Sequence, residues 1–347
     1  MMNKKTALIS GVTGQDGSYL SELLLEKEYI VIGLHRRTST NSFDRISGIL
    51  QHPNFSLCEF DLCDSSSVYE VVDRYKPDEF YNLAAQSHVA TSFKQPSLTF
   101  DINTQGVVNV LEAIRKYSPN TKLYQAGTSE MFGRNYSVDD KGLKYQDENT
   151  QFLPQSPYGV SKLASYRMLQ IYREAYGMFV SNGILFNHES PRRGELFVTQ
   201  KIALWIKSFL RWCRSNNLSP IELESKDDKL VYNNLIYDKL RLGNLKAERD
   251  WGHAKDYVKA MWLMLQQDKS DDYVISSDQT HSIDFFLSLA FNKIGIKDYK
   301  KYIYIDPKFC RPAEVDYLCG RSDKARKELG WLPLLSFEDL VAEMLNE

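Results

Sequence analysis

A glycine-rich turn close to the start of the chain restricts the fold more than any other stretch. Residues Thr6–Ser10 form a short apolar run typical of a buried strand, and a helical pattern spans residues 18–27. The glycines between them allow positive φ, close approach of a ligand to the backbone, and free N–H groups at the helix start. The turn therefore predicts the phosphate cradle of a dinucleotide-binding fold. Its predicted contact residues are Gly11, Thr13, Gly14, Gln15, Asp16 and Gly17.

Strand and helix patterns alternate after this turn. Such alternation is typical of a Rossmann-type α/β fold, in which a doubly wound parallel sheet binds ligands at the carboxyl ends of its strands. The expected strands are residues 29–34, 55–60, 79–83 and 122–126, and the expected helices are residues 66–75 and 98–116.

The end of the second strand indicates which dinucleotide is bound. An NAD site carries an acid here for the ribose diol, whereas this chain has Arg36 and Arg37 and no carboxylate before Asp44. Guanidinium groups suit a ribose 2′-phosphate, so the predicted cofactor is NADP. The ends of the third and fourth strands add predicted cofactor contacts. Asp61 and Leu62, after the third strand, are placed to bracket the adenine. The small side chains at the end of the fourth strand let the ribose and diphosphate pack against the backbone at Leu83, Ala84, Ala85 and Ser87.

Four residues have the chemistry of a catalytic site. Tyr158 and Lys162 lie four residues apart at a predicted helix start, where Ser156 is a plausible cap and Pro157 suits the first turn. An ammonium so close is expected to lower the pKa of the phenol, which makes it usable as a base. Thr128 and Glu130 follow the strand at 122–126.

Composition excludes several other classes of protein. The chain has 347 residues with 43 Lys and Arg against 45 Asp and Glu, so no net charge favours nucleic acid or an anionic membrane. Five cysteines form no C-x-x-C pair and no metal-ligand spacing, which indicates a reducing compartment and no metal. The apolar run near the N-terminus is too short for a signal or a membrane span, so we expect a cytoplasmic protein.

These motifs together resemble the GDP-mannose 4,6-dehydratases, a branch of the extended short-chain dehydrogenase/reductases. The resemblance spans nearly the whole chain, and the stretches at 187–194 and 249–256 are the most specific to this branch. The matching residues are 11–17, 36–37, 81–89, 128–130, 158 with 162, 187–194, 249–256 and 311–316.

The resemblance implies NADP-dependent dehydration of GDP-mannose to GDP-4-keto-6-deoxymannose. Tyr158 would take the proton of the C4 hydroxyl, and Thr128 would hydrogen-bond the C4 oxygen. Glu130 would remove the C5 proton and protonate the departing C6 hydroxyl, while hydride passes from C4 to NADP and back to C6. Lys162 would hold the nicotinamide ribose.

Further contacts and an oligomer also follow from the resemblance. His188 and Arg193 would lie on the cofactor side, and members of the family form homodimers or homotetramers. The nucleotide-sugar would be held by Ser87, Asn187, Lys201, Arg249, Arg311 and Glu314.

We expect two interleaved domains. Residues 1–186 form the NADP-binding domain, with returning segments near 250–280, and residues 187–347 form the smaller substrate domain. A helix at 322–329 is expected to cap the smaller domain.

A segment near residues 214–239 is longer than the family pattern and leaves alternatives open. By reshaping the sugar pocket, it could favour the same reaction on another nucleotide-sugar, such as a GDP-heptose. A catalytically silent NADP-binding sensor or interaction protein is a third possibility. The complete set Thr128, Glu130, Tyr158 and Lys162 argues against the silent protein.

Overall fold

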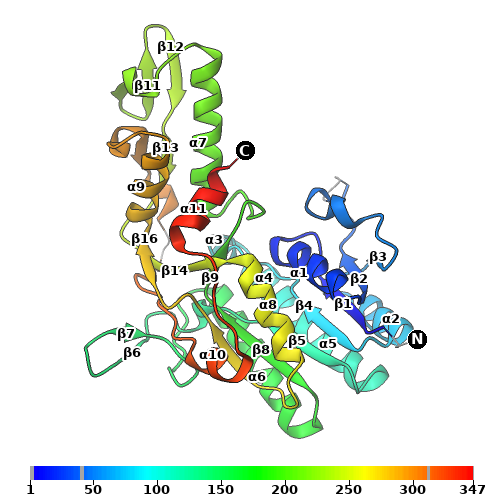
Figure 1. Ribbon diagram of the computed structural model, residues 1–347. Coiled ribbons are helices and arrows are strands. Elements are labelled where there is room, and N and C mark those ends of the chain that lie inside the picture. Colours follow the sequence, from blue (N-terminus) through cyan, green and yellow to red (C-terminus); the bar gives the residue numbers. More distant parts are fainter. Residues whose placement is uncertain (1–3, 40–42, 311–312, 347) are drawn as a thin grey trace.

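A seven-stranded parallel sheet forms the centre of the protein (Figure 1). The computed structural model describes residues 4–39, 43–310 and 313–346. The strand order is β15-β8-β5-β4-β1-β2-β3, and every neighbouring pair runs parallel, which confirms the predicted Rossmann-type sheet. The strands are β1 (Thr6–Ser10), β2 (Ile30–His35), β3 (Phe55–Glu59), β4 (Glu79–Asn82), β5 (Lys122–Ala126), β8 (Val180–Leu185) and β15 (Asp272–Ile275).

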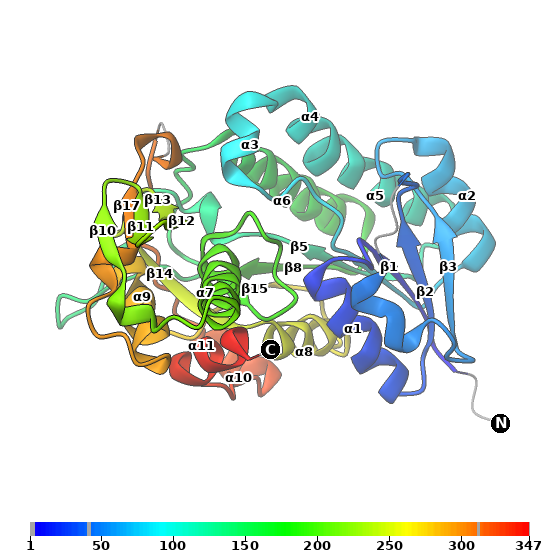
Figure 2. The ribbon, with the colours of Figure 1, turned by 90° about the horizontal axis from the view of Figure 1, so that it is seen from above.

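Helices cover both faces of this sheet (Figure 2). Because successive strand residues point to opposite faces, Ala7 and Ile9 pack with the helices of one face and Leu8 with those of the other. The first face carries α1 (Gln15–Glu26), α8 (Ala254–Leu265) and α10 (Asp323–Leu329). The second carries α2 (Ser65–Tyr75), α5 (Gly106–Tyr117) and α6 (Pro157–Tyr176).

A smaller unit with its own hydrophobic core stands beside the sheet. Its core is formed mainly by α7 (Val198–Ser215), α9 (Ile283–Lys293) and α11 (Phe337–Leu345). Figure 1 shows α7 rising away from the main sheet as the spine of an arm, with a three-stranded antiparallel meander beside its far end. The meander contains β10 (Glu224–Lys226), β11 (Lys229–Tyr232) and β12 (Leu235–Asp238).

Segments from the second half of the chain return to the main sheet. α8 packs against α1, and β15 forms the sheet edge beside β8, so the chain crosses the division expected at residue 187. The expectation that the helix at 322–329 caps the smaller unit is wrong. Ala325 and Leu329 of α10 pack into the core beneath the sheet, and α11 closes the smaller unit instead.

The helix expected at residues 98–116 is divided. α4 (Pro96–Phe100) is followed by a π-helical turn at Asp101–Gln105, and the regular helix α5 begins only at Gly106. The other short elements are α3 (Val89–Lys94), β6 (Ser137–Val138), β7 (Lys144–Tyr145), β9 (Asn187–Glu189), β13 (Leu240–Leu242), β14 (Glu248–His253), β16 (Thr280–Ser282) and β17 (Ile303–Ile305).

No helix in the described part of the chain combines the length and the apolar character needed to cross a bilayer.

Substitution of Trp331 tests how tightly the returning segments are packed. Its side chain is fully buried, its ring meets Tyr257 edge-on, and its Nε1 donates to Asp256 O at 2.7 Å. We expect Trp331→Ala to lower the free energy of unfolding by about 3–5 kcal/mol, since it opens a cavity in this core. Trp331→Phe keeps most of the volume and should cost clearly less. Urea denaturation measures both, and equal losses would show that packing is not the main contribution.

Candidate active site

The first turn of α6 presents Tyr158 and Lys162 as the sequence predicts. Pro157 occupies the first helical position, and Ser156 Oγ accepts a hydrogen bond from the Gly159 N–H at 3.0 Å. Tyr158 is 8% exposed and Lys162 is 3% exposed. Both groups are therefore held by the helix in a site that is largely closed to water.

Thr128 and Glu130 lie next to Tyr158 at the carboxyl end of β5. Thr128 Oγ1 accepts a hydrogen bond from the Glu130 N–H at 3.2 Å, which starts a short 3₁₀ turn, and its hydroxyl also hydrogen-bonds the Tyr158 phenol. The Glu130 carboxylate is close enough to Tyr158 to raise the pKa of the phenol. The structure thus brings together the two predicted proton-transfer groups, Tyr158 and Glu130, and the predicted hydrogen-bond partner Thr128.

Gly159 is a feature of this site that sequence reasoning missed. A Cβ at this position would lie 2.8 Å from Glu130 O, so only glycine lets the first turn of α6 pack directly on the turn after β5. The signal in the sequence is a glycine inside the first turn of a helix, where it would otherwise be unfavourable.

The expected lowering of the Tyr158 pKa is not what the structure shows. Burial raises the pKa of Tyr158 to about 12, and the hydrogen bond with Thr128 offsets only part of this rise. The Lys162 ammonium is not among the groups that set this pKa, and its Nζ donates to Ala126 O at 2.8 Å. Burial lowers the pKa of Lys162 itself to about 8.

The glycine turn before α1 has the form of a phosphate cradle. The Gly14 N–H donates to Gly11 O at 2.9 Å, and Gly11 has φ +69°. A Cβ on Gly17 would lie 2.3 Å from Gly11 O, so the helix meets the turn without space for a side chain. α1 begins without a side-chain cap, which leaves its first N–H groups for an anion such as the diphosphate of a dinucleotide.

Gln15, Asp16 and His188 bind one another instead of lining an open cleft. Gln15 Nε2 donates to His188 O at 3.1 Å, and Ser190 Oγ donates to Gln15 Oε1 at 2.8 Å. His188 Nε2 lies 2.8 Å from Asp16 Oδ2. Any contact of Gln15 and Asp16 with a diphosphate would therefore come from their backbone N–H groups. We call residues 188–192, which lie across α1, the strap.

Arg45 and Arg192 fix the strap and were missed by sequence reasoning. Arg45 Nη1 donates to Thr13 O at 3.2 Å and its Nε to Arg192 O at 2.8 Å, which joins the glycine turn to the strap. Arg192 in turn donates to Ser18 Oγ and pairs with Glu22. No local pattern in the sequence signals contacts across such separations.

The other predicted cofactor residues lie at strand ends. Arg36 and Arg37 are exposed directly after β2. Asp61 Oδ1 accepts from the Cys63 N–H at 3.0 Å, and Leu62 is buried. After β4, Ser10 Oγ accepts from the backbone N–H groups of Leu83 and Ala84, and Ala85 is half-buried.

The predicted substrate residues are grouped less tightly. Arg249 Nη2 lies 3.1 Å from Glu314 Oε1, so these two already form an ion pair. Asn187 pairs with the strand that carries Arg249, because β9 runs parallel to β14. Lys201 Nζ lies 3.5 Å from the centre of the Phe309 ring. Ser87 is exposed, and Arg311 lies outside the described residues.

Arg193 links the strap to the predicted catalytic residue Tyr158. Its Nε lies 3.0 Å from Glu189 Oε2, its guanidinium lies 3.6 Å from the Phe197 ring centre, and its charge lowers the pKa of Tyr158. Thr199 Oγ1 donates to the same Glu189 oxygen at 2.6 Å. The buried Glu189 is thus the residue that holds Arg193 in place.

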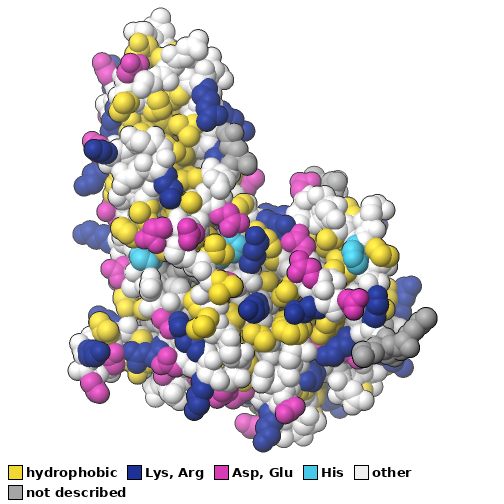
Figure 3. Space-filling view, in the orientation of Figure 1, with side chains coloured by type: hydrophobic (Ala, Val, Ile, Leu, Met, Phe, Trp, Pro, Cys, Tyr) yellow, Lys and Arg dark blue, Asp and Glu magenta, His cyan; other side chains and the backbone are white. Residues whose placement is uncertain are grey.

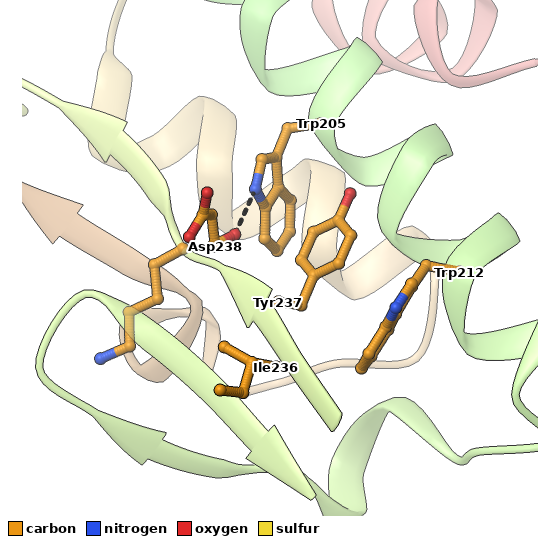
Figure 4. A pocket seen from close by; sticks show the side chains of 6 residues that line it. Trp205, Trp212, Ile236, Tyr237 and Asp238 are labelled. Carbon is orange, nitrogen blue, oxygen red and sulfur yellow. Dashed lines mark hydrogen bonds between the residues drawn. The ribbon is translucent and has the colours of Figure 1, made fainter. Parts of the chain in front are cut away.

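A separate pocket of about 480 Å³ opens beside α7 (Figure 4). Tyr237 of the meander lies between Trp205 and Trp212, and Trp205 Nε1 donates to Asp238 O at 3.0 Å. Hydrophobic side chains gather over this arm of the molecule, and Ile236 is 61% exposed (Figure 3). None of the predicted catalytic residues lines this pocket.

Within residues 4–39, 43–310 and 313–346, no group of three or more His, Cys, Asp or Glu side chains could hold a metal ion.

The fold and the site define a class, the Rossmann-fold enzymes of the extended short-chain dehydrogenase/reductase type. Solved structures share this fold over nearly the whole chain. The dTDP-glucose 4,6-dehydratase DesIV from Streptomyces venezuelae, with NAD and TYD bound, has a TM-score of 0.79 and 21% identity, and covers 98% of this chain and 95% of its own. RMD from Pseudomonas aeruginosa, complexed with NADPH, has a TM-score of 0.72 and 20% identity, with 99% and 98% covered.

Sequence comparison identifies the family within this class. The model of the GDP-mannose 4,6 dehydratase family matches residues 8–215 and 215–344. GDP-mannose 4,6 dehydratase 2 of Arabidopsis thaliana is 47% identical over 99% of this chain and 87% of its own length. The GDP-mannose 4,6-dehydratase of Vibrio cholerae serotype O1 is 41% identical over 99% and 93%. The chain belongs to the GDP-mannose 4,6-dehydratase family.

The glycine cradle can be tested without the reaction. Gly17→Ala should lower the affinity for a nicotinamide dinucleotide at least tenfold, since the added Cβ meets backbone atoms of the turn. Gly48→Ala is the matched control, because a Cβ there meets nothing within 4 Å. Isothermal titration calorimetry measures both affinities. Equal affinities for the two variants would contradict the cradle.

Proposed function

We propose that this chain is a hydro-lyase that converts GDP-mannose to GDP-4-keto-6-deoxymannose with NADP as its cofactor. The observation that carries the proposal is the meeting of Thr128, Glu130 and Tyr158 at the carboxyl end of β5. A reductase or epimerase needs only the hydroxyl and the Tyr/Lys pair, whereas elimination of water also needs an acid–base group for C5 and C6. Membership of the family, whose Arabidopsis and Vibrio relatives are named for GDP-mannose, supports the same substrate.

NADP is favoured over NAD by the end of β2. Solved proteins of the same fold bind NAD or NADPH, which supports a nicotinamide dinucleotide without distinguishing the two. Arg36 and Arg37 are exposed where the adenosine ribose would lie, and guanidinium groups pair well with a 2′-phosphate. Asp61 and Leu62 would bracket the adenine, and Leu83, Ala84, Ala85 and Ser87 would pack along the ribose and diphosphate.

Tyr158 and Glu130 would carry out the proton transfers on the sugar. Tyr158 would remove the proton of O4, while the Thr128 hydroxyl bonds that oxygen as it becomes a carbonyl. Glu130 would then remove the acidified C5 proton and protonate the departing O6. NADP, when bound, supplies the hydride acceptor for C4 and the hydride donor for C6.

Two cations would make Tyr158 a usable base. Arg193 already lowers the pKa of Tyr158. Lys162 would hold the nicotinamide ribose, and its pKa of about 8 leaves it mostly charged at neutral pH. His188 and Arg193 would close the cofactor side of the site.

The nucleotide end of the substrate would lie in the smaller unit. Lys201 and Arg249 would neutralise the diphosphate, and Glu314 would accept from a guanine or ribose donor. Asn187, Ser87 and Arg311 complete the proposed set.

The direct test is incubation of the purified protein with GDP-mannose alone. We expect the nucleotide-sugar to lose one water, about 18 Da by mass spectrometry, with no net NADPH formed. If GDP-mannose is unchanged while bound cofactor is verified, the substrate is wrong, and GDP-heptose with other GDP-, dTDP- and UDP-sugars should be tried. If none of these nucleotide-sugars reacts, the result would favour a non-catalytic NADP-binding protein.

Glu130→Gln should separate oxidation from elimination. Tyr158 is intact, so O4 can still be deprotonated, but no carboxylate remains to take the C5 proton. In a single turnover we expect a sugar lighter by about 2 Da and little product lighter by about 18 Da. Tyr158→Phe should form neither species and still bind cofactor. Normal dehydration by Glu130→Gln would exclude the proposed role of Glu130.

The pH profile should report on Lys162. Its pKa of about 8 lies below the ordinary 10.5, so the ammonium is present at neutral pH and lost as the pH rises through about 8. We expect dehydration to slow above this pH. Lys162→Arg keeps its charge and should move the alkaline limb to higher pH at a lower overall rate. An unmoved limb would mean that another group titrates there.

We further propose that the chain assembles as a homodimer or homotetramer through α6. Val160 and Ile171 are 42% and 51% exposed and lie about three helical turns apart on one face. α4, which contacts α6, adds the exposed Leu98 and Phe100. A second copy of the same face would bury these apolar side chains.

Val160→Glu with Ile171→Glu should therefore halve the molar mass found by light scattering, because a face that pairs with its own copy joins two chains or two dimers. Ile236→Glu places the same charge on an exposed apolar residue of the meander and should leave the mass unchanged. If the wild-type chain is monomeric, or if only Ile236→Glu dissociates it, the proposed interface is wrong.

A further inference from the structure

We propose that His188 is present as a cation whose task is to neutralise Asp16, so that the start of α1 can accept the diphosphate of the cofactor. The inference rests on the cofactor part of the proposed function. His188 acts here as a positioning residue that compensates the charge of Asp16 and does not touch the reacting atoms.

The Asp16 carboxylate lies where its negative charge would repel a bound diphosphate. It is the second residue of α1, in the turn whose uncapped N–H groups face the proposed diphosphate. An acid in the first turn ordinarily stabilises a helix, but here it would repel the ligand that the helix start is suited to bind. The Asp16 side chain is only 21% exposed, so water screens its charge weakly.

The hydrogen bonds of His188 require both of its ring nitrogens to donate. Nδ1 lies 2.8 Å from Phe186 O, and Nε2 lies 2.8 Å from Asp16 Oδ2. A carbonyl and a carboxylate are acceptors only, whereas a neutral imidazole has a single N–H. The geometry therefore fits the doubly protonated ring. The pKa shifts agree: burial opposes the charge of His188, but Asp16 raises its pKa overall, and the pKa of Asp16 is lowered.

Two neighbours support this pairing. The Tyr257 ring of α8 stacks on the imidazole with 4.5 Å between centroids and 24° between planes, an arrangement that favours a cation. Arg193 is the other cation that lowers the pKa of Asp16, but its Nε is held by the buried Glu189. His188 is therefore the direct counter-ion of Asp16.

Removing only one charge of the pair should reveal its role. His188→Gln leaves Asp16 uncompensated, so we expect the affinity for NADPH to fall about 10- to 100-fold. Asp16→Asn should bind NADPH about as well as the wild type, because no charge is left to neutralise. The double variant, Asp16→Asn with His188→Gln, should regain affinity to within about threefold of the wild type.

If the contact of Asp16 with His188 only stabilises the fold, the variants should show a different pattern of affinities. In that case each substitution would weaken binding, and the double variant would be no better than His188→Gln. The matched control is Arg192→Gln, which breaks the ion pair of the strap with Glu22 and its hydrogen bond to Ser18 but leaves the pair of Asp16 and His188 intact. It should lower the melting temperature but change NADPH affinity less than threefold. Equal loss in Arg192→Gln and His188→Gln would overturn the inference.

The measurement is calorimetric titration of the full chain with NADPH and NADH, without nucleotide-sugar, alongside thermal melting of each variant. If the wild type binds neither dinucleotide, the proposed cofactor and this inference both fail. If the wild type binds and Asp16→Asn does not rescue His188→Gln, only this inference fails. A shared loss of melting temperature in both single variants, with no rescue, would also contradict it.

Discussion

Direct packing of backbone on backbone at the carboxyl edge of the sheet determines the geometry of the whole site. Gly11, with φ +69°, would place a Cβ 3.0 Å from Ala84 N, and a Cβ on Gly17 would lie 2.3 Å from Gly11 O. At Gly159 the same absence of a side chain lets α6 reach Glu130 O. The cradle, the end of β4 and the turn after β5 that carries Glu130 are therefore held at fixed separations by contacts that leave no room for a methyl group.

The strap carries this rigidity into the second half of the chain. Residues 188–192 are bound to α1 by Gln15 and Asp16, and β9, in which the strap begins, pairs with β14. β14 leads directly into α8, which packs on α1 from the same face of the sheet. Interleaving of the two units thus links the residues proposed for the cofactor with Arg249, proposed for the nucleotide-sugar, through a short run of paired strands.

Sequence reasoning succeeded where the signal is local and failed where it depends on distant partners. The glycine turn and the Ser156 cap are encoded within a few residues, so the end of β1 and the start of α6 followed from them, although α1 begins at Gln15 and not at the expected residue 18. The pair of Asp16 and His188 joins residues 172 positions apart, and only the fold brings them together. The raised pKa of Tyr158 was also out of reach, because it comes from burial and not from its helical spacing to Lys162.

The segment after residue 215, where the family match is divided, is connected by ion pairs to groups beside the predicted substrate residue Lys201. Asp228, in the turn between β10 and β11, forms an ion pair with Nη2 of Arg241 in β13. The Nη1 of the same guanidinium lies 3.6 Å from Asp306 Oδ2. Asp306 raises and Arg241 lowers the pKa of Lys201, while burial lowers it most. A meander packed on the far end of α7 is thus joined through Asp228 to Arg241, one of the two charged groups that shift the pKa of Lys201, a residue proposed to meet the diphosphate.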